Sequence, residues 1–370
     1  MRVGIISGNW GMAAHLPAWR ALPDVEVVGV CTAHQDTAEA AAKANDIPMA
    51  FWDYRDLIAH PEIDLVDVGT RPDLRFDMCL AALAAGKHVY NAVPFSDTIE
   101  HARTLRDTAA GAGSITAVDA YSEHLPPIAL AKEIVADGGI GEVYMVNCSN
   151  EISLFDQPRS DFPYNWFQNG AHATSALRNL GSHALHVVYS LFGDIESVVA
   201  QDRQYVRDWA FTDAPGGLTP DPEVTDTAAM LFRLESGGIG TFTASWVPVH
   251  GSGFTLDAFG SRGHLRLRGQ GTMPTNATKV YYAGLGSSEG LVEVAVPGRL
   301  TSRDGIGLSG QADQMLPKFA MAVLFRQMID AAQGHGRVRP DFADAYQVQA
   351  IIEAARRSAV VDAWVRPAAL

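Results

Sequence analysis

The feature that most constrains the fold of this chain is the alternation of short apolar runs with helix-like patterns over its first 119 residues. The runs of strand length are 3–6, 25–31, 64–68, 88–90 and 114–118. The segments with helical spacing between them are 13–22, 37–45, 74–85 and 98–111. Parallel strands need a crossover connection that is usually a helix, so this alternation predicts right-handed βαβ units on a parallel sheet.

Beyond about residue 120 the pattern changes to strand-like runs in succession. These runs are 143–149, 197–206, 225–235, 238–246, 254–260 and 263–267, with helical patterns at 127–137, 184–191, 317–333 and 343–363. Short turns such as Ser236-Gly237-Gly238 favour antiparallel pairing. A chain of 370 residues also exceeds the usual single core of about 250 residues. We therefore expect an α/β protein with a Rossmann domain over 1–120 and an α+β domain with a large, mostly antiparallel open sheet over 121–370.

The charge balance excludes two classes of partner. Forty-two acidic against 28 basic side chains give a net charge of -14, which repels nucleic acids and anionic membranes. No apolar stretch approaches the ~20 residues of a membrane span, and a strand-like run follows Met1 directly, so we expect a cytoplasmic protein. Cys31, Cys79 and Cys148 have apolar neighbours, which suits buried, reduced thiols, and we expect no metal site.

The turn after the first strand is the candidate nucleotide site. A strand, a Gly-containing turn and a helix present free backbone N–H groups to a pyrophosphate. On the template Gly-x-Gly-x-x-Gly, however, Ser7, Asn9 and Met12 occupy the three glycine positions. A plain βα turn is the alternative. The predicted cofactor-binding residues of this turn are Ser7, Gly8, Asn9, Trp10, Gly11 and Met12.

The end of the second strand bears on cofactor choice. An acidic residue there accepts the ribose 2′-hydroxyl of NAD, but this chain has Thr32. Thr32 and His34 can donate to a 2′-phosphate, and no arginine stands beside Thr32 to strengthen such a site. The expected cofactor is NADP or NAD, with a slight preference for NADP.

Several motifs in order resemble the glucose-fructose oxidoreductase / inositol dehydrogenase / MocA (Gfo/Idh/MocA) family over nearly the whole chain. They include His15-Leu16-Pro17-Ala18, Val68-Gly69-Thr70-Arg71-Pro72, Ala85-Gly86-Lys87-His88-Val89, Gly138-Gly139-Ile140-Gly141-Glu142 and Asn179-Leu180-Gly181-Ser182-His183. The resemblance implies hydride transfer to or from sugars, cyclitols or related alcohols. It also implies an oligomer, a dimer or tetramer, formed through the open sheet. Thr70, Arg71 and Asn91 are further candidate cofactor contacts.

The chain departs from the family at the residues that carry its chemistry. The family has Glu-Lys-Pro after the fifth strand, where this chain has Ala92-Val93-Pro94, and an Asp-x-x-x-His pair, where this chain has Asn179 and His183. Only five lysines occur, and none can take the place of Val93. Loss of that cation removes a few kcal/mol of alkoxide stabilisation. His183 is the candidate acid/base and Asn179 its catalytic partner; a hydrogen-bonded histidine at a helix start is the alternative.

An aromatic and amide-rich stretch at 161–172 precedes the His183 motif. Aromatic faces stack on sugar or aryl rings and amides bind hydroxyls, so Tyr164, Trp166 and His172 are candidate substrate contacts. The alternative is a loop whose aromatics only pin it to the sheet or to another subunit. The groups expected to supply further electrostatics at the substrate are Glu123, His124, Arg178 and His186.

Two functions follow from these residues. The first is an NAD(P)-dependent oxidoreductase acting on a secondary alcohol or carbonyl of a sugar, glycoside or cyclic polyol, with His183 as acid/base. The second is a dinucleotide- or sugar-binding regulatory protein that has lost turnover.

Overall fold

The computed structural model describes residues 1–161, 164–269, 271, 273–311 and 316–370, without the side chains of Tyr164 and Asn165. It forms two compact units, residues 1–124 with 301–346 and residues 125–300 with 347–370. The sequence places everything beyond residue 120 in the second domain, and the segment 301–346 departs from that expectation. Its helix α9 (Lys318–Ala332) packs on α1 (Leu16–Trp19), where Phe325 stacks on Trp19 with ring centroids 3.6 Å apart.

The first unit is built on a six-stranded sheet in the order β3-β2-β1-β4-β5-β6, in which every pair is parallel. Its strands are β1 (Arg2–Ile6), β2 (Glu26–Cys31), β3 (Met49–Phe51), β4 (Leu65–Val68), β5 (His88–Asn91) and β6 (Thr116–Val118). The predicted parallel sheet is confirmed. Right-handed crossovers place the helices on both faces, because the chain reverses its direction along the sheet after β3.

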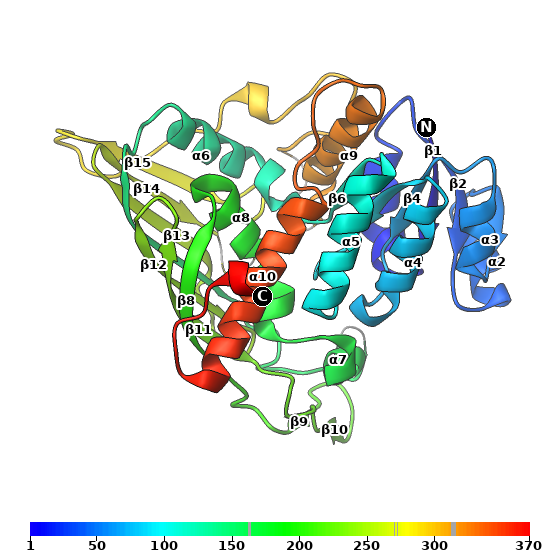
Figure 1. Cartoon of the computed structure of the whole chain (residues 1–370), viewed down its shortest axis with the longest axis horizontal. Coiled ribbons are helices and arrows are strands. Elements are labelled where there is room, and N and C mark those ends of the chain that lie inside the picture. The colour runs from blue at the N-terminus through cyan, green and yellow to red at the C-terminus, as the bar shows by residue number, and fades with distance from the viewer. Residues whose placement is uncertain (162–163, 270, 272, 312–315) are drawn as a thin grey trace. The chain divides into compact units, whose positions relative to one another are not determined.

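The helices of this unit are η1 (Gly11–His15), α1, α2 (Gln35–Ala44), α3 (Tyr54–Ala59), α4 (Pro72–Ala84), α5 (Ile99–Ala112) and η2 (Tyr121–His124). Figure 1 shows α4 and α5 side by side, and the two helices pack together. Strand β3 and helix α3 are not predicted from the sequence, because a three-residue strand and a six-residue helix are too short to show a period. The helix predicted over 13–22 begins instead with the π-helix η1.

The second unit is built on an eight-stranded sheet in the order β16-β15-β14-β13-β7-β12-β11-β8. Its strands are β7 (Val143–Glu151), β8 (Ile195–Arg203), β11 (Thr227–Leu234), β12 (Ile239–Ser245), β13 (Gly253–Gly260), β14 (Gly263–Arg268), β15 (Lys279–Gly284) and β16 (Val292–Glu293). Only β7 and β12 pair in parallel, so the predicted mostly antiparallel sheet is confirmed. A separate two-stranded sheet is formed by β9 (Trp209–Ala210) and β10 (Gly217–Leu218), which pair antiparallel.

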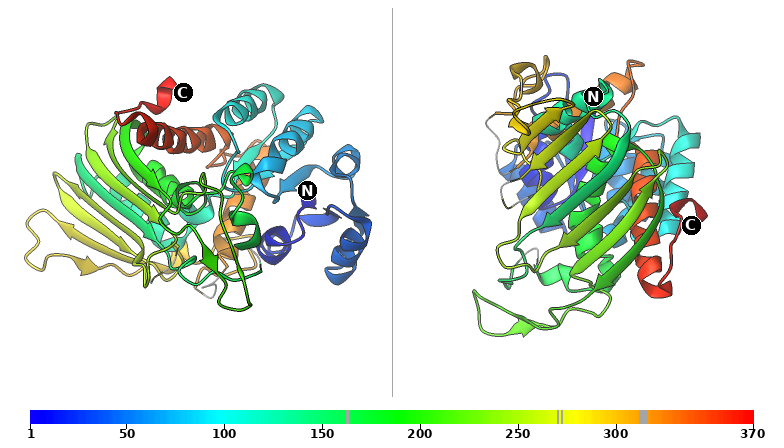
Figure 2. Two further views of the ribbon diagram at one scale, coloured as in Figure 1. Left: turned by 90° about the horizontal axis from the view of Figure 1, so that it is seen from below. Right: turned by 90° about the vertical axis from the view of Figure 1, so that its left-hand side faces the viewer.

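The two faces of the large sheet differ. On one face α6 (Pro126–Ala136) packs on β15 and α8 (Ser182–Phe192) packs on β7. Side chains alternate accordingly along β11, where Met230 and Phe232 are buried and Leu231 is exposed. The right-hand view of Figure 2 looks onto the other face, which no helix of the described chain covers in that view.

The remaining helical segments are α7 (Tyr164–Phe167), η3 (Gly170–His172), η4 (Leu177–Gly181), η5 (Gly298–Leu300), α10 (Phe342–Val361) and η6 (Pro367–Ala369). Within the described ranges, no helix is both long enough and apolar enough to span a bilayer. All three cysteines are buried free thiols, as the sequence predicts.

Candidate functional site

The carboxyl edge of the first sheet gathers the residues that follow its strands. The last residues of neighbouring strands are register partners: Ile6 with Cys31 and Val68, Val68 with Asn91, and Asn91 with Val118. The strand order reverses between β1 and β4, where open α/β sheets bind their ligands. The turn predicted to hold the cofactor lies at this reversal.

The turn after β1 uses some of its backbone donors internally and leaves others available. Gly11 N–H donates to Ser7 Oγ at 3.2 Å, and the N–H groups of Met12 and Ala13 both donate to Asn9 O at 3.0 Å. Within the described chain, no hydrogen bond engages the N–H groups of the three preceding residues, Gly8, Asn9 and Trp10. These three consecutive donors can bind an anion such as a pyrophosphate.

Glycines keep this turn close to the end of β4, although not at the template positions. A Cβ at Gly11 would lie 2.6 Å from Ser7 Cβ, and a Cβ at Gly69 would lie 3.1 Å from the same atom. Neither position therefore has room for a side chain unless Ser7 moves. Gly11 and Gly69 thus give the close backbone approach that template glycines give elsewhere, and the turn fits a dinucleotide.

Directly beneath the turn, a buried charged cluster surrounds His15. The imidazole is fully buried, with Nδ1 at 2.9 and 3.0 Å from the two carboxylate oxygens of Asp67 and Nε2 at 3.2 Å from Asp119 Oδ2. Three neutral groups also donate to these carboxylates: Trp19 Nε1 to Asp67 at 2.8 Å, Trp10 Nε1 to Asp119 Oδ2 at 3.0 Å, and Tyr90 OH to Asp119 Oδ1 at 2.5 Å.

Burial by itself lowers the pKa of His15, but Asp67 and Asp119 outweigh that effect and raise the pKa to about 10. The ring is therefore an imidazolium at neutral pH, and both of its nitrogens donate. The hydroxyl of Tyr90 stays protonated, because burial and the Asp119 charge raise its pKa well above 10.0. The cluster thus joins two carboxylates through one buried cation.

This cluster is not among the sites predicted from the sequence, although the sequence contains a signal for it. Asp67 is a charged residue inside the fully buried strand β4, and Asp119 directly follows the fully buried strand β6. Buried carboxylates are almost always paired, so each of them calls for a buried partner. His15 was noted only as part of a family motif.

The residues predicted to contact the cofactor ribose lie after β2. Thr32 Oγ1 donates to His34 O at 3.1 Å and lies 2.6 Å from Thr37 Oγ1. The His34 side chain is exposed and makes no capping bond to α2. The carboxylate of Asp36, in the first turn of α2, accepts from Thr37 N–H at 2.8 Å.

The other predicted cofactor contacts lie after β4 and β5 and are engaged locally. Thr70 Oγ1 donates to Met78 Sδ at 3.6 Å, and Arg71 pairs with Asp73 at 3.3 Å. Asn91 is fully buried, and its Nδ2 donates to Phe95 O at 2.8 Å. The amide of Asn91 therefore stabilises the segment that contains Val93.

Arg75 of α4 lies close to Asn91. Its side chain is 1% exposed, and Nη1 approaches Asn91 Oδ1 at 3.5 Å. Burial lowers the pKa of Arg75 to about 10, with Cys79 and Asp119 among the groups that oppose this effect. The guanidinium therefore remains charged at neutral pH and adds a second buried cation near the His15 cluster.

In the second unit, the candidate acid/base lies near the start of α8. The π-helix η4 runs directly into α8, so Asn179 and His183 are on successive turns. Asn179 Oδ1 accepts from Ser175 N–H at 3.0 Å. His183 is partly exposed, whereas His186 is 2% exposed.

Arg178, predicted to supply charge to a substrate, forms an ion pair within the second unit. Its guanidinium is buried and donates to Glu353 of α10 at 3.1 Å. Arg356 binds the other oxygen of Glu353 at 3.2 Å. The charge of Arg178 thus ties η4 to α10.

The aromatic loop is partly explained by packing. Trp166 lies against a cluster formed by Phe155, Phe167, Trp209 and Trp246. His172 Nδ1 is 2.9 Å from Trp166 O, so these two residues pin the loop, and the backbone of Tyr164 begins α7. In the first unit, Glu123 is 4% exposed in η2, and His124 Nε2 donates to Arg339 O at 2.7 Å.

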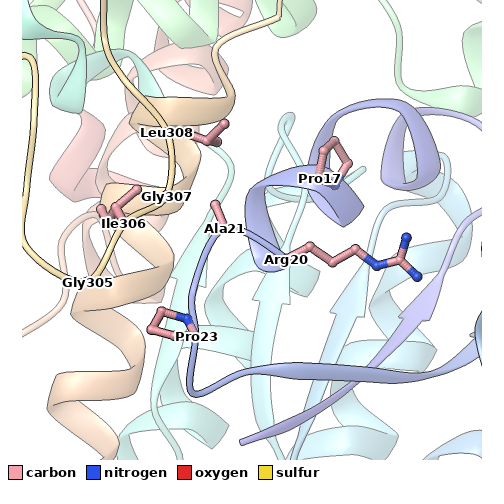
Figure 3. A pocket seen from close by; sticks show the side chains of 8 residues that line it. All are labelled: Pro17, Arg20, Ala21, Pro23, Gly305, Ile306, Gly307 and Leu308. Carbon is pink, nitrogen blue, oxygen red and sulfur yellow. The ribbon is translucent and has the colours of Figure 1, made fainter.

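A cavity of about 630 Å³ lies elsewhere in the first unit. Figure 3 shows residues 17–23 facing residues 305–308 across it, with Arg20 extending to one side. None of the turn residues Ser7–Met12 lines this cavity. Within the described chain, no three His, Cys, Asp or Glu side chains form a group that could hold a metal ion.

Comparison with known proteins gives matches to both parts of the chain. Residues 1–120 match the oxidoreductase family with an NAD-binding Rossmann fold, and residues 128–266 match the Gfo/Idh/MocA C-terminal domain. Levoglucosan dehydrogenase of Pseudarthrobacter phenanthrenivorans is 25% identical over 405 residues, covering 99% of this chain and 97% of that protein. Trans-1,2-dihydrobenzene-1,2-diol dehydrogenase of Sus scrofa is 25% identical over 249 residues, covering 66% and 68%.

Solved structures share the fold. An NAD binding oxidoreductase from Klebsiella pneumoniae has a TM-score of 0.86 at 24% identity, covering 99% of this chain and 98% of that one. Levoglucosan dehydrogenase in complex with NADH and levoglucosan has a TM-score of 0.86 at 22% identity, with the same coverage. Together with the two family matches, this similarity shows that the chain belongs to the Gfo/Idh/MocA family of NAD-binding oxidoreductases.

Proposed function

We propose that this protein transfers hydride between a nicotinamide cofactor and a secondary alcohol or carbonyl of a sugar, glycoside or cyclic polyol. The observation that carries the proposal is the run of three available N–H groups at Gly8, Asn9 and Trp10, where the strand order reverses. Two relatives that act on related compounds, levoglucosan dehydrogenase and a dihydrodiol dehydrogenase, support the substrate class. When bound, the cofactor supplies or accepts the hydride; the chain must bind it, position the substrate and move the hydroxyl proton.

We assign the proton transfer to His183. An imidazole titrates near neutral pH, which suits a group that takes a hydroxyl proton in one direction and returns it in the other. His183 is partly exposed, and the Arg178–Glu353 ion pair secures the turn that precedes it. Asn179, one turn earlier, can present its amide N–H₂ to a substrate oxygen, because its Oδ1 is already engaged with Ser175 N–H.

The test compares His183→Gln with His186→Gln, because both histidines belong to α8 and only His183 is accessible. His183→Gln should lower kcat by about 10²-fold or more and leave the Kd for NADH unchanged. His186→Gln should affect stability more than kcat. Equal losses of kcat in the two variants would contradict the assignment of His183.

We further propose that the cofactor site accepts NADPH at least as well as NADH. No carboxylate follows β2 directly, and His34 is exposed and free to approach a 2′-phosphate. Asp36 in the first turn of α2 is the nearest opposing charge in sequence. Thr32→Asp should raise the Kd for NADPH at least tenfold relative to NADH, and Asp36→Asn should favour NADPH. A wild-type protein that binds NADH far more tightly than NADPH would refute this preference.

The second candidate function, a non-catalytic regulatory binder, rests on one observation. Val93 is an apolar residue where the family has its lysine, and the nearby amide of Asn91 is buried in the loop itself. This function predicts NAD(P)H binding without turnover on any member of a polyol and glycoside panel. Failure to bind either cofactor at millimolar concentration would overturn both candidates.

We also propose that the face of the eight-stranded sheet opposite α6 and α8 mediates assembly into a dimer or tetramer. Leu231 and Ile239 are 50% and 58% exposed there, and the ion cluster of Asp257 with His264, Arg266 and Arg268 lies on the same face beyond strand β7. An exposed patch of this mixed kind is suited to a subunit interface. Light scattering should report an oligomer for the wild type and a smaller species for Leu231→Glu.

A further inference from the structure

The turn after β1 contains an aromatic side chain that is tied to a different strand end. Trp10 is the last of the three residues with available N–H groups, and its indole Nε1 donates to Asp119 Oδ2 at 3.0 Å. We propose that the Trp10–Asp119 hydrogen bond is a positioning device for the cofactor pyrophosphate, holding the donors of Gly8, Asn9 and Trp10 in the orientation that binds it. This inference rests on the proposed dinucleotide binding.

The acceptor of this bond, Asp119, is held by three other contacts. The backbone N–H of Asp119 donates to Asn91 O at 2.8 Å, so the residue is anchored to the end of β5. Tyr90 OH holds one carboxylate oxygen at 2.5 Å, and His15 Nε2 approaches the other at 3.2 Å. Asp119 is 3% exposed. The indole is therefore bound to a carboxylate that has no freedom to follow a moving turn.

The turn needs such a tether because its other two residues, Gly8 and Asn9, can adopt several backbone conformations. Gly8 and Asn9 are exposed, and no described side chain bonds to their backbone N–H groups. Glycine and asparagine both adopt several turn conformations, so the two residues alone do not select one. Donors that are already oriented lose less conformational entropy when a ligand binds, and the Trp10 tether supplies that order.

The charge balance is compatible with an anion above this bond. A carboxylate beneath a pyrophosphate would repel it, but two buried cations oppose the charges of Asp119 and Asp67: the imidazolium of His15, which lies against both carboxylates, and the guanidinium of Arg75, which interacts with Asp119. The indole N–H reaches the same oxygen without adding charge. Removing that N–H therefore frees the turn and also leaves the carboxylate with one donor fewer.

The test uses Trp10→Phe, which keeps an aromatic ring and deletes the donor. Calorimetric titration with NADH and with ADP-ribose measures binding without turnover, and ADP-ribose carries the pyrophosphate but no nicotinamide. We expect Kd to rise about tenfold for both ligands, which corresponds to a turn that holds the binding conformation only about one tenth of the time once the tether is gone.

The matched control is Trp19→Phe. Trp19 Nε1 donates to Asp67 Oδ2 at 2.8 Å in the same cluster, but Trp19 is fully buried in α1 and carries no residue of the turn. Trp19→Phe should lower the Tm at least as much as Trp10→Phe while leaving both Kd values within about twofold of wild type. The ratio of the Kd increase in Trp10→Phe to the Kd increase in Trp19→Phe separates a positioning effect from a general loss of stability.

Each outcome decides the proposal. A Kd for ADP-ribose that is unchanged in Trp10→Phe, or that rises equally in Trp19→Phe, would overturn the positioning role while the proposed function stands. A wild-type protein that binds neither NADH nor ADP-ribose would overturn both. A rise confined to NADH would place the effect of Trp10 at the nicotinamide and would also refute the proposal.

Discussion

The charged state of His15 should contribute measurably to the free energy of unfolding. His15 is fully buried between Asp67 and Asp119, and its pKa is raised from 6.5 to about 10. Each pKa unit corresponds to about 1.4 kcal/mol, so the preference for the imidazolium stabilises the fold by about 5 kcal/mol. A folding free energy is typically only about 5–15 kcal/mol, so this one proton is a large share of it.

The sign follows from the direction of the shift. Because the folded pKa lies above the unfolded one, the contribution is complete below pH 6.5 and is lost as the pH rises toward 10. Wild-type stability should therefore fall by about 1.4 kcal/mol per pH unit from this residue alone across that window. His15→Gln has no such proton, so it should be less stable near pH 7, and the gap should close at higher pH.

The assay is urea unfolding of wild type and His15→Gln at half-unit steps from pH 7 to 9.5. Lysines, tyrosines and the free thiols titrate in both proteins, so the difference between the two curves isolates His15. A difference that stays constant over these steps would refute the reasoning, since it would mean that the ring is neutral and that a protonated carboxylate completes the cluster. The imidazole NMR signal of His15 provides an independent check, because it should not titrate below pH 9.

Three further predictions concern other parts of the molecule. Burial lowers the pKa of His88, whose Nδ1 accepts from Ile115 N–H at 3.0 Å, so stability should fall as the pH drops below 6.5; His88→Gln should show a flatter acid limb in urea unfolding between pH 5 and 7. Arg178→Met removes the buried partner of Glu353, which keeps its pair with Arg356, so the change should cost about 2 kcal/mol of unfolding free energy in a urea titration. Val93→Lys should raise any weak dehydrogenase rate measured with NAD(P) and a polyol panel; an unchanged rate would mean that another group stabilises the alkoxide.

Much of the fold could be predicted because its signals are local. The apolar runs of β1, β2, β4 and β5 and the period-2 pattern of β11 identify strands without any tertiary information. The short elements β3 and α3 carry no such period. The return of 301–346 to the first unit depends on α9 packing against α1, and a helical pattern does not specify its partner.

The candidate site was predictable only in part, because only its contiguous residues leave a local signal in the sequence. The turn at 7–12 is contiguous, so a motif finds it, even with Ser7, Asn9 and Met12 in the glycine positions. The role of an individual side chain, in contrast, depends on partners that lie far away in the sequence. Arg178 carries the charge expected of a substrate contact, yet its guanidinium is bound to Glu353, 175 positions later in the chain.

By itself, the sequence determined the class of the protein: two sheets of different type, a nucleotide turn at the start, and a histidine motif without the family lysine. Hydrophobic periodicity and residue chemistry are properties of short segments, so they can be recognised from the sequence without the tertiary structure. Only the tertiary structure decided that Gly11 and Gly69 make the close approach around Ser7, and that Asp67, Asp119 and Trp10 meet at His15. These groups come from separate strand ends, and the register of a parallel sheet alone brings them to one edge.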